Sequence, residues 1–169
     1  MKPVAWAAAG AALLSIGAVL AGCDDPKTPV SSSGVSSGKT HVNERAVWMT
    51  NFELAQSQAK IEKKPIFISF SGSDWCGWCI KLDREVFSRP AFADWAAKNV
   101  ILFLADFPQN TPQSAEVKKQ NEELAKKYGV DGFPTVVLVN ADGKELGRAG
   151  YQPGGAESYV KMLDGILKK

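Results

Sequence analysis

Hydrophobic positions follow two patterns after residue 43. Apolar residues recur every three or four positions in five segments, which predicts helices at residues 51–63, 76–87, 91–99, 114–129 and 156–169. Short, almost continuous apolar runs predict buried strands at residues 66–70, 100–107 and 135–140. An Asp-Gly turn at 142–143 then predicts a partner strand over 145–151. Thr50 and Glu53 have the spacing of a capping box at the start of the first helix.

If the neighbouring helical pieces at 76–87 and 91–99 are counted as one unit, the order of these segments is α-β-α-β-α-β-β-α. Helices that alternate with buried strands predict an α/β fold with a central, mainly parallel sheet flanked by helices on both faces. The closing hairpin adds an antiparallel edge, so the sheet is expected to be mixed. Residues 43–169 therefore form one predicted domain.

The N-terminal segment has a different character. Residues 1–22 begin with one lysine and continue as an uncharged apolar run, which is the pattern of a secretory signal. The run ends in the letters LAGC, which resemble the bacterial lipoprotein signal, and this resemblance implies that Cys23 is lipidated. Asp24 fits a signal for retention in the inner membrane. An ordinary cleaved signal and an uncleaved anchor helix remain alternatives.

Residues 23–42 are rich in Ser, Gly, Pro and Thr and contain little that a core would bury. This composition predicts a flexible tether with an average reach on the order of 25 Å. His41 is the only histidine of the chain and lies in this tether, where we interpret it as a solvated linker residue.

Composition and charge narrow the classes of function. Of the 169 residues, 45% are hydrophobic and 22% are charged, which is ordinary for a globular protein with one sizeable core. The net charge is +2, and lysines are scattered among acids rather than gathered in a stripe. The sequence therefore does not predict nucleic-acid binding.

Two cysteines separated by two residues, Cys76 and Cys79, are the main candidates for chemistry. A haem attachment site needs His directly after the second cysteine, where this chain has Ile80. A structural zinc site needs four ligands, and Cys23 and His41 both lie in the predicted tether. An iron–sulfur cluster lacks thiolates for the same reason. A redox pair and a structural disulfide remain.

The position of the pair favours the redox interpretation. Cys76 lies where a predicted strand gives way to a helix, and the amides at a helix N-terminus lower the pKa of a thiol. Cys79 follows one turn later, from where its thiol can attack a mixed disulfide at Cys76. A disulfide that closes so small a loop removes little chain entropy, so it would be a weak structural staple.

The letters WCGWC after a strand, and GFPT before a later strand, resemble the thioredoxin superfamily. The resemblance extends from about Trp48 to the end, to exported thioredoxin-like proteins with a Gly-Ser-x-Trp-Cys approach. It implies an exposed attacking thiol at Cys76, a more buried resolving thiol at Cys79, and a redox disulfide between them. It also implies a substrate-contacting Trp75 and a cis peptide at Phe133-Pro134, whose edge, with Thr135, would bind substrate.

Several positions around the cysteine pair depart from the thioredoxin pattern or need interpretation. Gly77 and Trp78 stand where thioredoxin has Gly-Pro, and Trp78 is expected to alter the redox poise. Ser69 occupies the place of a buried Asp, and the place of its Lys partner falls near Leu102. Asp74, or its neighbour Ser73, is expected to cap the helix.

These features predict a membrane-tethered thiol–disulfide oxidoreductase of the bacterial cell envelope, facing the periplasm or the outside. Cys76 would attack a client disulfide and Cys79 would resolve the intermediate, with reduction the preferred direction. No organic cofactor or metal is required, but a membrane thiol electron donor must restore the dithiol. The alternatives are a binding or chaperone-like module with a static disulfide, and a metal-delivery protein, which the lack of further ligands disfavours.

Overall fold

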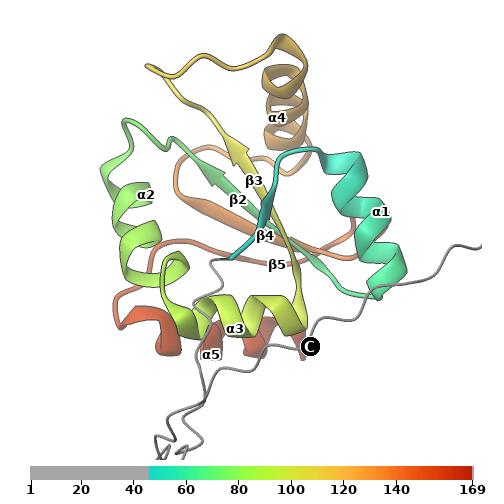
Figure 1. Cartoon of the computed structure of the whole chain (residues 1–169), viewed down its shortest axis with the longest axis vertical. Helices are drawn as coiled ribbons and strands as arrows, with labels where there is room; N and C mark the ends of the chain where they lie inside the picture. Colours follow the sequence, from blue (N-terminus) through green and yellow to red (C-terminus); the bar gives the residue numbers. More distant parts are fainter. Residues whose placement is uncertain (1–45, 169) are drawn as a thin grey trace, which may run out of the picture. The chain divides into compact units, whose positions relative to one another are not determined.

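The computed structural model describes residues 46–168, which form a five-stranded sheet and its surrounding helices (Figure 1). The strands, in sheet order, are β1 (Trp48–Met49), β3 (Ile101–Asp106), β2 (Ile66–Ser71), β4 (Thr135–Val139) and β5 (Glu145–Ala149). The helices are α1 (Phe52–Glu62), α2 (Gly77–Leu82), the π-helix η1 (Asp83–Phe87), α3 (Pro90–Asn99), α4 (Ala115–Lys127) and α5 (Gly155–Leu167).

Strand β2 lies at the centre of the sheet. It runs parallel to β3, which is also parallel to β1, and antiparallel to β4, which pairs in turn with β5. Ile68 of β2 stands opposite Phe103 on one side and Val137 on the other. Because helices cover both faces, every residue of 66–70 is buried, which explains why the run is apolar except at Ser69. The predicted α/β fold with a mixed, helix-flanked sheet is confirmed.

The sheet separates two hydrophobic cores. Alternate residues of β2 point to opposite faces, so Phe67 joins one core and Phe70 joins the other. The first core packs Phe67 against residues of η1, α3 and α5, and the second is covered by α1 and α4 (Figure 1). The position of β2 is therefore fixed by hydrophobic packing on both faces of the sheet.

The helix predicted over 76–87 is divided. After α2 the chain widens into η1, where the amide of Ser88 bonds to the carbonyl of Asp83, five residues back. Pro90 then occupies the first turn of α3, where a missing N–H costs no hydrogen bond. This arrangement turns the chain from the cysteine pair toward the face where α3 packs.

Two local expectations differ from the structure. The prediction of a capping box at Thr50 and Glu53 is wrong. The N-cap residue is Asn51, whose side chain accepts a 3.0 Å hydrogen bond from the amide of Leu54. The two-residue strand β1 was not predicted, since two residues are too few to show a period.

The predicted signal at 1–22, Cys23, Asp24 and the tether at 23–42 lie outside the described residues. Within residues 46–168, none of the helices combines the length and apolar character needed to cross a membrane. The described domain begins just before β1 and ends with α5.

Candidate active site

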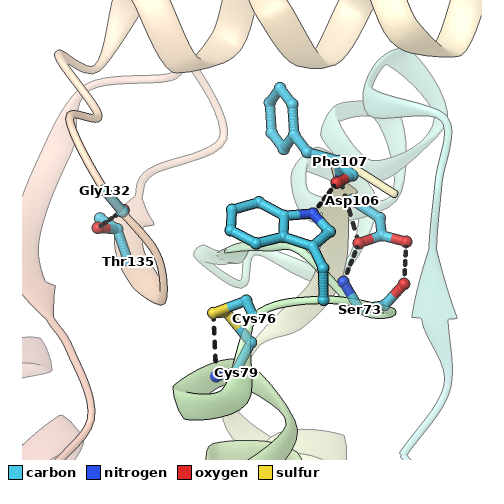
Figure 2. Close-up of a disulfide and its surroundings, with 8 residues drawn as sticks. Ser73, Cys76, Cys79, Asp106, Phe107, Gly132 and Thr135 are labelled. Carbon is cyan, nitrogen blue, oxygen red and sulfur yellow. Dashed lines mark hydrogen bonds between the residues drawn. A yellow bond between two sulfur atoms is a disulfide. The ribbon is translucent and has the colours of Figure 1, made fainter. Parts of the chain in front are cut away.

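Cys76 is the N-cap residue of α2, just beyond the end of β2. Its sulfur accepts a hydrogen bond from the amide of Cys79 at 3.2 Å, and the two residues are joined by a disulfide (Figure 2). Their Cα atoms are 5.2 Å apart. The sulfur of Cys76 therefore occupies the place where a helix start presents its free amides.

The two cysteines differ little in exposure. Cys76 is 7% exposed and Cys79 is 4% exposed, so the expectation of an exposed Cys76 is wrong at the level of the whole residue. Large apolar side chains around the pair are more open, with Trp75 at 43%, Trp78 at 57% and Ile80 at 49%. The cysteine pair is therefore buried among apolar side chains that are themselves more exposed.

The Phe133–Pro134 peptide bond is cis. It directly precedes β4, whose first residue, Thr135, pairs with Phe70 near the end of β2. The hydroxyl of Thr135 donates to the carbonyl of Gly132 at 2.7 Å, which closes the loop that faces the disulfide (Figure 2). The antiparallel pairing of β4 with β2 thus brings the proline loop beside the cysteines, although almost sixty positions separate them in the sequence.

Trp75 is held by contacts on two sides. Its indole nitrogen donates to the carbonyl of Phe107 at 2.7 Å, and its ring lies 5.9 Å from that of Phe133 in an edge-to-face arrangement. Gly72 lies under the indole, so close that a Cβ atom there would lie 2.4 Å from the ring. Residue 72 must therefore lack a side chain for Trp75 to hold this position.

Ser73 does not cap α2. Its amide and hydroxyl both donate to the carboxylate of Asp106, at 2.9 and 2.6 Å (Figure 2). The sulfur of Cys76 takes the capping role instead. The active-site turn is thereby attached to the end of β3.

Asp74 does not cap α2 either, and the expectation for both residues is wrong. Its carboxylate accepts hydrogen bonds from three successive amides, those of Gln109, Asn110 and Thr111, at 2.9, 2.7 and 3.0 Å. These bonds, led by the one from Gln109, lower the pKa of Asp74, while desolvation opposes them. Three converging donors from another loop are a better partner for the carboxylate than one helix amide.

Trp78, between the cysteines, packs against Tyr151 at 5.1 Å between ring centres. The Lys81 ammonium lies 4.9 Å from the centre of each of these rings. The Tyr151 hydroxyl donates to Glu85 at 2.7 Å, and this bond is the main cause of a lowered pKa at Glu85. Sequence reasoning missed Tyr151, because the contact joins the predicted end of a strand to a distant helix.

A cavity of about 250 Å³ lies behind Cys79. Its lining includes Ser69, Cys79, Asp83 and Pro134. Ser69 is 2% exposed, and Leu102 is buried in the first core. Neither side chain is ionisable, so these two positions lack the charges of the Asp and Lys in the thioredoxin pattern. The space is ample for water, since a cavity of roughly 10–15 Å³ is enough to hold one molecule.

Comparison with known proteins agrees with this geometry. A family model described as a thioredoxin-like domain matches residues 52–165. The chain is 40% identical over 118 residues to the disulfide bond reductase DsbH of Chlamydia pneumoniae, covering 70% of this chain and 71% of that protein. It is 28% identical over 104 residues to the thioredoxin-related protein DsbJ of the same organism, covering 62% of this chain and 30% of that one.

A solved structure of a DsbH oxidoreductase is also similar. It superposes with a TM-score of 0.75 at 34% identity, and the match covers 82% of this chain and 95% of that one. The similarity therefore extends over nearly all of the described domain.

Proposed function

Because the chain belongs to the thioredoxin-like family and is a thiol–disulfide oxidoreductase, we propose that it reduces disulfides of client proteins in the bacterial cell envelope. The observation that carries the proposal is the placement of the Cys76 sulfur at the start of α2, bonded to the Cys79 amide and beside the cis-proline loop. The reductive direction is supported by the similarity to a disulfide bond reductase.

In the proposed reaction the dithiol form acts first. The Cys76 thiolate attacks one sulfur of the client disulfide, which forms a mixed disulfide and releases the other client sulfur as a thiolate that takes up a proton. Cys79 then loses its proton and attacks the Cys76 sulfur. The second client sulfur leaves as a thiol, and the chain retains the Cys76–Cys79 disulfide. Two electrons have then passed to the client, with one proton supplied by Cys79 and one by solvent.

The client side of the site is proposed to consist of Trp75, Phe133, cis-Pro134 and Thr135. An extended client segment would pair with the backbone edge beside Pro134 and bring its disulfide to Cys76. Gly77 and Trp78 are proposed to tune the redox potential. A membrane thiol donor returns two electrons to the disulfide after each turnover.

The first experiment measures the redox potential of the pair in glutathione or dithiothreitol buffers, together with insulin reduction. A potential above about −300 mV, with turnover, supports the proposal, because structural disulfides lie below that value. A lower potential without turnover would instead support the binding module with a static disulfide.

Trapping identifies the roles of the two cysteines. A Cys79→Ser variant should accumulate client proteins linked covalently through Cys76, because the second attack is lost. The matched Cys76→Ser variant should trap none. Equal trapping by both variants would contradict the assignment of Cys76 as the attacking thiol.

We also propose that lipidated Cys23 tethers the domain to a membrane, with Asp24 favouring the inner membrane. The support is the letters LAGCD at residues 20–24, which close the apolar run of the predicted signal. Cys23→Ala should move the protein from the membrane fraction to the soluble fraction. Unchanged membrane association would refute lipidation as the tether.

A further inference from the structure

Three aromatic side chains from three different loops meet beside the cysteine pair. They are Trp75, Phe107 and Phe133, which we call the aromatic platform. The Phe107 and Phe133 rings stack at 5.0 Å with an angle of 28° between their planes, and Trp75 meets Phe133 edge-on at 5.9 Å. Each of the three remains partly exposed. The platform adjoins the reactive pair, because Trp75 directly precedes Cys76 and Phe133 directly precedes cis-Pro134.

The loop that carries Phe107 is held by the residues just before Cys76. Trp75 bonds to the carbonyl of Phe107, and the Asp74 carboxylate receives the amides of residues 109–111. On the other side of Phe107, Ser73 binds Asp106 through two hydrogen bonds. The active-site turn and the loop at 106–111 therefore form one hydrogen-bonded unit, and Asp74 supplies half of its six bonds between the two segments.

We propose that the aromatic platform binds an apolar side chain adjacent to the client's cysteine, and that Asp74 is the positioning residue that holds the platform together. This inference rests on the proposed function and adds a substrate class to it. Aromatic faces bind apolar side chains by removing their surface from water. The three amides occupy the carboxylate of Asp74, so this acidic residue serves the loop instead of binding a client.

Asp74 acts through Phe107 rather than by contact with the client. Without the carboxylate, the amides of 109–111 lose their shared acceptor. The loop then keeps only the bonds near Phe107 itself, so the Phe107 ring is held less firmly against Phe133. The apolar binding surface would then be weakened while Cys76 and Cys79 stay in place. Client preference should change more than the chemistry at sulfur.

The test is a single-turnover assay with the full chain in its dithiol form. Three oxidised substrates are compared: 2-hydroxyethyl disulfide, and two matched peptide disulfides with either Leu or Ser beside each cysteine. The wild type should prefer the Leu peptide over the Ser peptide by about tenfold in second-order rate constant. The preference should fall to about twofold in Asp74→Ala and in Phe107→Ala, and take an intermediate value in Asp74→Asn, which keeps one acceptor oxygen.

Phe107→Ala keeps the main-chain carbonyl that Trp75 binds, so it removes the ring alone. Asp142→Ala, which changes an exposed carboxylate in the β4–β5 turn, is the control and should keep the wild-type preference. The Trp75 indole N–H resonance should shift in Asp74→Ala, which reports the movement of its partner loop.

Equal wild-type rates on the two peptides would overturn the inference. It would also be overturned if Asp74→Ala slowed all three substrates by the same factor, since the preference would then not depend on Asp74. A wild-type protein that reduces none of the three substrates would instead show that the proposed function fails. A retained preference in Phe107→Ala would remove Phe107 from the platform and likewise overturn the inference.

Discussion

The ring centres of Trp78 and Tyr151 lie 5.1 Å apart. Trp78 stands between the two cysteines, whereas Tyr151 follows the last strand, β5. The Lys81 ammonium sits at equal distances from both ring centres, and Glu85 accepts a hydrogen bond from the Tyr151 hydroxyl. The side chain between the cysteines is therefore tied to the segment between β5 and α5. The residue that distinguishes this active site from that of thioredoxin has a partner that the sequence motif does not contain.

Replacing Tyr151 by Phe should raise the pKa of Glu85 toward its ordinary value. The hydroxyl is the largest cause of the lowered pKa, and Tyr151→Phe removes it while keeping the ring beside Trp78. An NMR titration of the Glu85 side chain checks this result. Arg84→Gln is the comparison, because Arg84 contributes less and its loss should move the titration by a smaller amount; a larger shift there would contradict the assignment.

Replacing Gly72 by Ala should displace Trp75. The new Cβ would lie 2.4 Å from the indole, which forces the ring off the Phe107 carbonyl. We expect a loss of about 1–3 kcal/mol in the free energy of unfolding, typical of overpacking, measured by urea denaturation. Gly165→Ala is the control, because nothing lies within 4 Å of a Cβ there. Equal costs for both changes would show that the close approach at Gly72 is not the cause.

Replacing Ser69 by Asp should make stability depend on pH. Residue 69 is 2% exposed, and burial disfavours the charged form of a carboxyl, so its folded pKa should lie above the unfolded value. The variant then loses stability as pH rises from the unfolded pKa through the folded pKa. A shift of two pKa units would cost about 2 kcal/mol between pH 4 and pH 7.5, because the unfolded carboxyl is already about half ionised at pH 4.

Urea denaturation of Ser69→Asp at the two pH values measures this difference. Ser69→Asn has nearly the same shape and does not titrate, so its stability difference from the wild type should stay constant. A constant difference for Ser69→Asp as well would show that water in the cavity behind Cys79 keeps the carboxylate solvated.

Acidification should release the loop at 106–111. The folded pKa of Asp74 is lowered, so its bonds stabilise the fold fully above the unfolded pKa and are lost as pH falls through the folded value. The amide shifts of Gln109, Asn110 and Thr111 should then move together between pH 7 and pH 2. Asp106 also faces this segment and binds Ser73, so the Ser73 amide must be followed separately.

The Asp74→Asn variant provides the control for this titration. Its side chain does not ionise, so the shared step in the three amide shifts should vanish while any step at the Ser73 amide remains. A step that persists at residues 109–111 in this variant would assign the titration to another group.

Local sequence patterns predicted the frame well. The runs at 66–70 and 135–140 are almost continuously apolar because both faces of β2 and β4 are covered, and this is visible without a structure. The pair at Cys76 and Cys79 was placed at a strand-to-helix junction by the change of period alone. These features depend on neighbours within a few residues.

The contacts that surround the pair depend on distant residues. Asp74 was expected to cap its own helix, a local rule that three amides 35 to 37 positions away override. The sequence places Phe107 at the end of the buried strand predicted over 100–107, and nothing in that pattern shows that the ring stacks on Phe133. Such pairings arise when the sheet brings loop ends together, so they require the fold to be known first.

The central place of β2 has a mechanical consequence for electron transfer. The strand is bonded along its length to β3 and β4, so its amides belong to the part of the chain that should open least often in hydrogen exchange. The two sulfurs lie just beyond the C-terminal end of β2, at the start of α2. The disulfide there can form or break while every strand keeps its neighbours in the sheet. We therefore expect the domain to pass repeatedly between its disulfide and dithiol forms while the sheet stays intact. A partner protein would then have to contact the start of α2 to distinguish the two forms.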